Sequence, residues 1–406
     1  MTTTTSPWRA FSAAPHRMMF FAGATQGVLT ILWWLVDLLG RYTGLYAPLI
    51  WPVVPQWAHG FLMIYGFFPF FIFGFLMTVY PNWMNGEPVP RRRYIPAFAL
   101  LAGGQVLFYA GLFVGKPVLL VGVLSVLAGW AVAYYALLRV LFGAVHPDKL
   151  HPAITAVALG FAWLGIAAYA AWLAGAGDGF AVFSLKTGVW LFLVPVFFTV
   201  SHRMIPFFSS RIIDGYHIVR PKWALWTVLS CSAAHGILEM VGAERWLWLV
   251  DIPFVAASLH LTWHWQIFKS FKERLLAVLH IGFAWLSLAL ALSALQSLAA
   301  LAGYPVFGFA PLHALTIGFF ASMVLAMATR VTLGHSGREL KADGATWALF
   351  LAFQAAALTR IAGDLPLPHH GHFYLLAAVI WLGCFIPWWV KYAPVYLRPR
   401  QDGVAG

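Results

Sequence analysis

Histidine is the residue type whose number and placement in this sequence point to chemistry. The chain holds 15 histidines against only 13 acidic residues. Polar groups are costly in hydrocarbon and usually mark a function there. Neutral imidazole is the standard ligand of haem iron and also suits copper and non-haem iron. Seven histidines lie within or at the edge of long apolar segments, namely His59, His202, His235, His260, His264, His280 and His313.

The depth of these histidines along their segments divides them into two layers. His59 and His313 each stand near the outer start of a segment, which predicts that they share a level. The hypothesis of a b-type haem, to which the family resemblance described below leads, has these two as its ligands and His280 as the main competitor. The inner layer predicts a second metal, copper or non-haem iron. Its candidate ligands are some of His202, His260, His264 and His280, or alternatively His235 with Glu239.

Plainer interpretations of the same histidines stay open. The outer pair can be polar caps that face lipid headgroups, and His260 and His264 can form hydrogen bonds between helices. Histidines outside the apolar segments, among them His146 and His151, are expected to be solvated.

His235 and Glu239 form a second kind of candidate site. Their spacing of four residues puts both side chains on one helix face. The pair is expected to be catalytic or to relay protons, and a purely structural pair is the alternative. Asp251 and Asp37 are further candidates for a proton path.

Arginine is concentrated in two strings at the inner ends of histidine-bearing segments. The rigid guanidinium fork suits carboxylates, and haem propionates are carboxylates. Arg203, Arg330 and Arg338 are therefore candidate partners of a haem. The alternative is that they only set the orientation of the chain in the membrane.

The elements that must position these side chains follow from composition. Hydrophobic residues make up 62% of the 406 residues and charged residues 9%, whereas an ordinary soluble domain is about 25% charged. This excludes a soluble enzyme, a disordered protein and a nucleic-acid binder. A bilayer core needs about 20 apolar residues per helix. Twelve such segments are predicted, at 17–39, 58–80, 95–114, 117–142, 153–174, 180–204, 223–241, 246–266, 274–301, 311–333, 345–363 and 372–392.

Lys and Arg predict the orientation of this all-α bundle. With the N-terminus in the cytoplasm, 20 of the 25 basic residues fall on the cytoplasmic side, as the positive-inside rule requires. Both termini are then cytoplasmic, with an N-terminal tail at 1–16, one transmembrane domain at 17–392 and a C-terminal tail at 393–406. The two cysteines cannot form a disulfide framework, and no CxxCH haem attachment or convincing internal repeat is present in the sequence.

Several motifs resemble the NnrS family of bacterial membrane proteins over most of the chain. They include Pro15-His16-Arg17, the strings around His59 and His280, and Arg203-Met204-Ile205-Pro206-Phe207-Phe208. The most specific runs from Met327-Ala328-Thr329-Arg330 through Gly334-His335-Ser336-Gly337-Arg338. Gly60 departs from the pattern, because an acid is often found there, and so does His202, where Gly is common.

The resemblance implies a haem-containing and also copper-containing protein of the bacterial inner membrane, linked to nitric oxide metabolism and nitrosative stress. The helix count and the histidines of the second and tenth segments are also distantly similar to haem–copper oxidase subunit I. The expected activity is an oxidoreductase that reduces nitric oxide to N2O with electrons from quinol or a separate redox protein. A transporter or channel for a small molecule, and a haem-based nitric oxide sink or sensor without turnover, are the alternatives. A homo-oligomer is compatible with all three.

Overall fold

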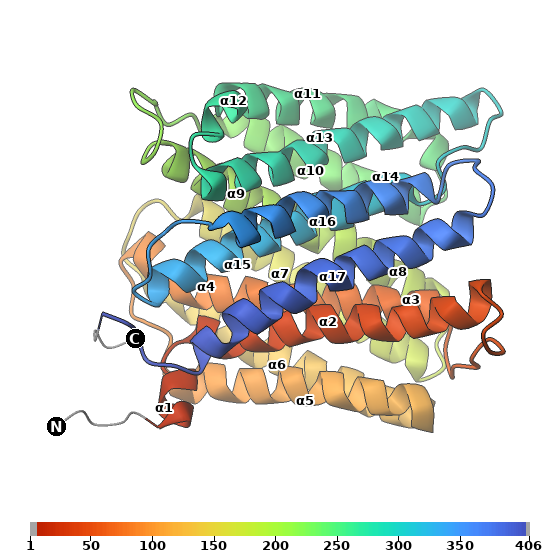
Figure 1. The fold of residues 1–406 in the computed structure, drawn as a ribbon, viewed down its shortest axis with the longest axis horizontal. Helices are drawn as coiled ribbons and strands as arrows, with labels where there is room; N and C mark the ends of the chain where they lie inside the picture. The colour runs from red at the N-terminus through yellow and green to blue at the C-terminus, as the bar shows by residue number, and fades with distance from the viewer. Residues whose placement is uncertain (1–5, 403–406) are drawn as a thin grey trace.

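The computed structural model describes residues 6–402 and is all-helical, with no strand among them (Figure 1). Nine of the long helical rods in this part of the chain are single, unbroken α-helices. The unbroken long helices are α2 (Pro15–Tyr42), α5 (Arg91–Val114), α6 (Lys116–Gly143), α7 (Leu150–Leu173), α10 (Lys222–Met240), α11 (Trp248–His264), α13 (Arg274–Leu301), α16 (Gly344–Ala362) and α17 (His370–Tyr396).

Three further rods contain a π-helical segment, and we call them the inner rods. The first is α3 (Pro55–Phe61), η1 (Leu62–Phe67) and α4 (Phe68–Met84); the second is α8 (Gly179–Thr187), η2 (Gly188–Leu193) and α9 (Val194–Ser209); the third is α14 (Ala310–His313), η4 (Ala314–Ala321) and α15 (Ser322–His335). Short helices occupy connections: α1 (Pro7–Phe11), η3 (Glu244–Trp246) and α12 (Ile267–Ser270). Helix α1 lies within residues 1–16, which were expected to form an N-terminal tail.

The predicted segments coincide with the rods, and ten of the rods in the described part of the chain are long and apolar enough to cross a membrane. The two that fall short are α10 and α11. The 17 residues of α11 extend only about 25 Å at 1.5 Å per residue, and α10 carries the polar residues His235 and Glu239. Both lie alongside the other rods (Figure 1). A helical membrane protein is therefore shown, while the count of twelve spans stays a prediction.

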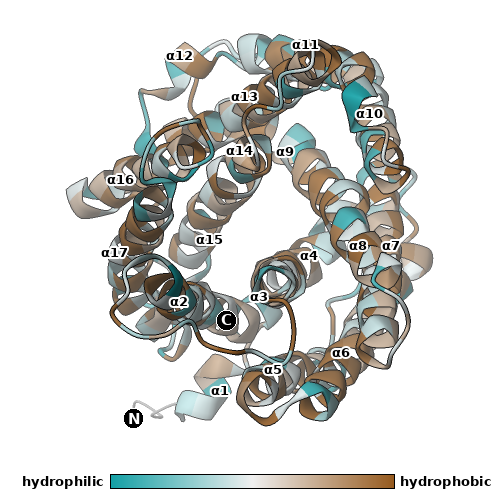
Figure 2. Cartoon of the chain, turned by 90° about the vertical axis from the view of Figure 1, so that its right-hand side faces the viewer, coloured by the Kyte–Doolittle hydropathy of each residue, from teal (hydrophilic) through white to brown (hydrophobic). Residues whose placement is uncertain are grey.

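The inner rods lie around the centre of the bundle, and the other long helices form a ring about them (Figure 2). The inner rods are among the most buried spans of the protein. The ring closes where α17 packs against α2, and there Trp381 Nε1 donates to the Gly27 carbonyl at 2.9 Å. Residues far apart in sequence thus meet at one seam.

The three π segments reveal a structural repeat. They begin at residues 62, 188 and 314, so successive segments are 126 residues apart. Each inner rod is the second of four consecutive long rods, and the chain therefore consists of three quartets. Because a π segment holds one extra residue per turn, it changes the direction in which all later side chains point. The repeat is one of helix order and backbone geometry, so it is not visible as repeated sequence.

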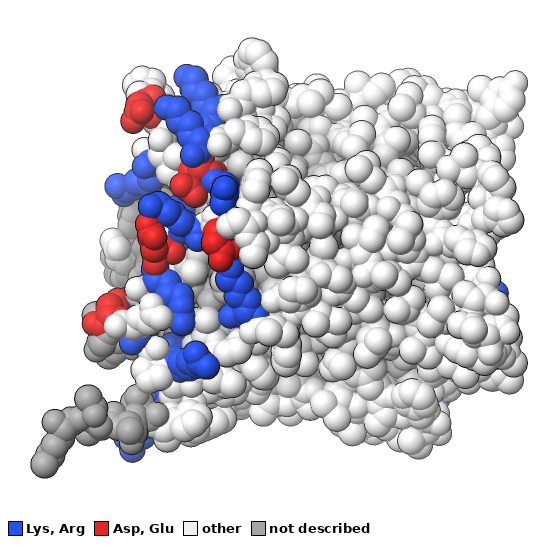
Figure 3. Space-filling view, in the orientation of Figure 1, with Lys and Arg blue, Asp and Glu red and all other residues white. Residues whose placement is uncertain are grey.

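Both ends of the described chain lie at the same end of the bundle, which we call the terminal end (Figure 1). Lys and Arg gather at this end, and the remainder of the face in Figure 3 is nearly free of charge. The opposite end is called the far end. The separation agrees with the predicted charge asymmetry, and the cytoplasmic location of the terminal end stays a prediction.

Candidate metal and proton-transfer sites

His59 and His313 lie at the far ends of two inner rods, within the short helices that precede their π segments. His313 Nδ1 donates to the Phe309 carbonyl at 2.9 Å. Because a carbonyl only accepts, Nδ1 carries the proton, and Nε2 of the neutral ring keeps its lone pair. The His59 ring stacks on Trp34 with centroids 4.5 Å apart. Its buried Nδ1 has no hydrogen-bond partner among the described residues. Each ring therefore has a nitrogen free to bind a metal.

The charges near these two rings already balance. Arg360 Nη1 donates to Asp364 Oδ2 at 2.6 Å, and Tyr374 donates to the other carboxylate oxygen at 2.8 Å. Arg360 and His59 are close enough to His313 to interact with it electrostatically. Since one arginine is matched by one aspartate, neither histidine needs a proton for charge balance. Neutral imidazole is the form that ligates metals.

His235 lies in a quite different environment, inside a buried network at the second inner rod. Its Nδ1 is 2.6 Å from Asp251 Oδ1, and its Nε2 is 3.6 Å from Glu239 Oε1. The side chains of His235 and Asp251 are 1% and 0% exposed. The spacing of four residues therefore correctly placed Glu239 beside His235, and Asp251 from α11 completes the group.

The second inner rod supplies the other members of this network. Glu239 Oε2 accepts from Trp190 Nε1 at 2.7 Å and pairs with Lys186 Nζ at 2.9 Å. The Trp190 ring stacks on His235 with centroids only 3.5 Å apart. Trp190 belongs to η2 and Lys186 shortly precedes it. Two carboxylates and one lysine sum to zero only when the imidazole is protonated, and uncompensated buried charge is costly. We refer to these residues as the His235 network.

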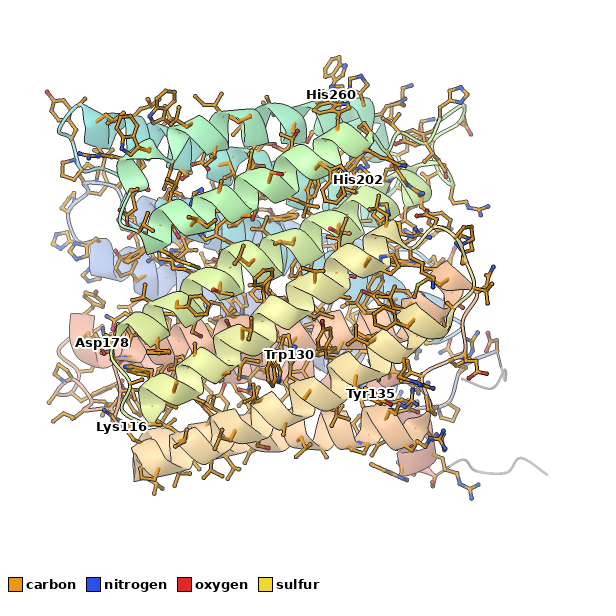
Figure 4. The ribbon with its side chains drawn as sticks, turned by 180° about the vertical axis from the view of Figure 1, so that it is seen from behind. Lys116, Trp130, Tyr135, Asp178, His202 and His260 are labelled. Carbon is orange, nitrogen blue, oxygen red and sulfur yellow. The ribbon has the colours of Figure 1, made fainter. Side chains whose placement is uncertain are left out.

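The histidines of the inner layer do not gather into one site. His202 Nδ1 is 3.0 Å from His151 Nε2, and His280 Nε2 is 3.1 Å from Ser209 Oγ. His260 and His264 stack on each other at 3.9 Å, and the His264 side chain is exposed. Figure 4 shows His202 and His260 at separate places toward the terminal end. Within residues 6–402, no three His, Cys, Asp or Glu side chains are arranged to hold a metal ion.

His151 corrects one expectation, because it is buried rather than solvated. It follows the first residue of α7 and packs against α9. His202 Nε2 faces the Pro221 carbonyl at 3.3 Å and must donate to it. His202 Nδ1 then accepts from His151 Nε2, which leaves a lone pair on His151 Nδ1. That atom is buried without a hydrogen-bond partner in the described chain.

The arginines of the two basic strings lie at the terminal end. Arg330 stacks on Phe208, with Cζ 3.9 Å from the ring centroid, and Arg203 stacks on Trp83 at 4.7 Å. One terminal nitrogen each of Arg330 and Arg338 is buried and finds no partner among residues 6–402. Arg330 and His313 are 17 residues apart on one rod, about 25 Å. These arginines therefore suit an anionic group near His280 rather than one near His313.

The loop between α9 and α10, which lies near these arginines, contributes further buried polar groups, Tyr216 and Arg220. Burial raises the pKa of the Tyr216 hydroxyl to about 12, so this group stays protonated at neutral pH. Burial, together with the nearby Arg203, lowers the pKa of Arg220.

Sequence reasoning missed several members of these sites. Lys186 and Trp190 were assigned no role, and Asp251 was only one of several acids. The rings of His16 and His335 lie 4.7 Å apart at the terminal end and were not paired. An acid within an apolar segment was the available signal for Asp251. Asp37, the other acid expected on a proton path, forms an ion pair with Arg41 at 2.7 Å and accepts a hydrogen bond from Trp51 Nε1 at 2.7 Å. These contacts are those of a structural residue.

Comparison with known proteins adds one finding. A family model described as NnrS protein matches residues 10–400, nearly the whole chain. No curated protein matches it.

Proposed function

Because the chain belongs to the NnrS family, which links it in general terms to nitric oxide, we propose that it binds haem b and reduces nitric oxide in the membrane. Two nitric oxide molecules, two electrons and two protons give one N2O and one water. The observation that carries the proposal is the contrast between two histidine environments. His59 and His313 lie beside balanced charges and each keep a nitrogen without a hydrogen-bond partner, whereas the two carboxylates and one lysine around His235 balance only with a protonated imidazole.

His59 and His313 are the residues that would hold the haem. Their donor chemistry fits haem iron, because both rings come from inner rods and each would offer a nitrogen free to bind the metal. Arg360 is the cation of this site, and it is already paired with Asp364. When bound, the haem iron supplies the redox centre at which nitric oxide reacts.

Neighbouring groups of the chain hold both rings in place. The Phe309 carbonyl fixes the tautomer of His313, and stacking on Trp34 restricts rotation of the His59 ring. His280, whose Nδ1 is buried without a partner in the described chain, is the competing ligand, with Arg330 and Arg338 as its anion partners.

His235 would act as the proton donor. Its proton is held between Asp251 and Glu239, and Glu239, which contacts Lys186, lies on the route by which that proton is replaced. A general acid is a positioned side chain that gives its proton to a reacting group, and histidine is the residue most often used. A second metal, copper or non-haem iron, and a quinol or protein electron donor stay predictions.

The test is an optical and EPR spectrum of the purified protein, with metal analysis, for wild type and single variants. We expect one haem signature that is lost or changed in axial ligation in His59→Ala and His313→Ala. His372→Ala is the matched control, because His372 is an exposed residue near the same end. Retention of an unchanged haem spectrum in both variants, with loss in His280→Ala, would move the haem to the terminal end.

Turnover is measured separately, as steady-state nitric oxide consumption with a reductant. Consumption with N2O release supports the reductase, and it should fall in His235→Gln while the haem content stays normal. Haem that binds nitric oxide once without turnover indicates a sink or sensor. A colourless, metal-free protein would favour a transporter and overturn the proposal.

A further inference from the structure

A small, partly open apolar cavity lies where the three inner rods approach one another and α2. Its volume is about 50 Å³, and it is lined by α2, α4, α9 and α15. Its walls include Phe71, Phe197 and Met323, one from each inner rod and spaced by 126 residues. Phe75, Ser201 and Met327 form a second set with the same spacing. Equivalent positions of all three quartets therefore contribute to its wall, and we call it the axial cavity.

The chemistry of the walls excludes water as the natural occupant. A buried water needs about two to four hydrogen-bond partners, and Ser201 is the one side chain with a hydroxyl among those that line the cavity. The Ser201 Oγ is itself buried without a hydrogen-bond partner in the described chain. Apolar cavities in proteins stay dry and take up small apolar molecules and xenon.

The volume of the cavity limits how large a bound molecule can be. A cavity that accepts benzene measures about 150 Å³, so a space of about 50 Å³ admits a molecule of two or three heavy atoms. A lipid chain is too long for it. Nitric oxide is apolar enough to enter from the bilayer, and its weak acceptor atoms suit a single hydroxyl.

We propose that this axial cavity is a docking site for a diatomic gas, with nitric oxide as its occupant and the Ser201 hydroxyl as its one polar contact. Nitric oxide as the occupant rests on the proposed function, whereas gas binding itself does not. The site holds nitric oxide within the protein interior, at a point that all three quartets share.

The test is xenon binding to the full-length protein in lipid nanodiscs, followed by xenon NMR and by density maps of xenon-pressurised samples. We expect one xenon atom in the axial cavity in wild type and in Ser201→Ala, which keeps the space open. Ser201→Met should abolish binding because its side chain fills the cavity. Ala328→Val, a smaller change at another wall residue, should weaken binding if Ser201→Met does not fold. Val106→Met on the exposed surface of α5 is the matched control and should bind as wild type does.

Anaerobic nitric oxide should then displace the bound xenon in wild type, and removing the hydroxyl in Ser201→Ala should weaken that displacement. Water density in the axial cavity, xenon binding retained in both filled variants, or xenon that nitric oxide does not displace would overturn the inference. These equilibrium measurements need no haem or turnover, so they can succeed where the proposed function fails.

Discussion

At the scale of single residues, charge balance separates the two histidine sites. The rings of His59 and His313 lie beside a matched Arg360–Asp364 pair and can be neutral. The ring of His235 lies between two carboxylates of which Lys186 neutralises only one. Imidazole is the only side chain whose ordinary pKa allows both states near neutral pH. The same residue type can therefore be neutral at one place and protonated at another, which is what the proposed roles of ligand and proton donor require.

Replacing Asp251 tests the proton assignment. Asp251→Asn leaves Glu239 and Lys186 in balance, so His235 should lose its proton. Nitrogen NMR of labelled protein at pH 8 should show an imidazolium signal in wild type that disappears in the variant. The loss of a charge-assisted hydrogen bond should cost about 2 kcal/mol of unfolding free energy.

Asp178→Asn is the matched control, because Asp178 accepts from Trp172 Nε1 at an exposed site. We expect no change of imidazolium signal and under about 0.5 kcal/mol of destabilisation there. If the imidazolium signal persists in Asp251→Asn, the proton does not reside on His235.

At the scale of elements, the π segments place the candidate sites. His59 precedes η1, His313 precedes η4, and Trp190 lies in η2. A run of apolar residues specifies that a rod is helical, but not that it contains an extra residue per turn. π segments are frequent at functional sites. A side-chain cap marks the start of α16, where Asp343 accepts from a backbone N–H.

Asp343 caps α16 by accepting from the Thr346 N–H at 2.9 Å. Replacement by alanine should cost about 1 kcal/mol at neutral pH. A hydrogen bond from Lys391, and then the one from Thr346, lower the pKa of Asp343 to about 2, whereas an unfolded aspartate titrates near about 4. The charged form therefore stabilises the fold above about pH 4, and this contribution is lost as the pH falls toward about 2.

Thermal unfolding of wild type and Asp343→Asn between neutral and acidic pH measures this effect. Asparagine still caps the helix but lacks the charge. The stability difference between the two proteins should be present at neutral pH and vanish at the acid end. A difference that is constant with pH would contradict the ion pair.

At the scale of the whole molecule, the ring depends on the seam between the first and last long helices. Arg17 at the start of α2 is buried. Its Nε donates to the Tyr396 carbonyl at 3.1 Å and its Nη2 to the Val395 carbonyl at 3.2 Å; the Arg398 carbonyl is a third acceptor. One side chain therefore satisfies carbonyls at the C-terminal end of α17 that the helix leaves free.

Arg17→Ala should open this seam locally. We expect a loss of about 3 kcal/mol, because hydrogen bonds to a charged group are worth more than neutral ones. Amide hydrogen exchange should accelerate around residues 393–399 and stay unchanged in α13. Arg9→Ala, at an exposed position of α1, should change neither. Uniform acceleration over all rods would indicate global rather than local opening.

The sequence by itself determined the helical membrane class, the position of every long rod, the charge asymmetry and the pairing of His235 with Glu239. These follow from composition and from spacing along one chain, which local physics controls. Only the tertiary structure decided that Asp251 and Lys186 complete the His235 network, that His151 is buried against His202, and that the inner-layer histidines separate. Each residue turns a helix by about 100°, and each π segment shifts that phase. Which side chains from different rods meet therefore depends on packing between rods, which no single segment encodes.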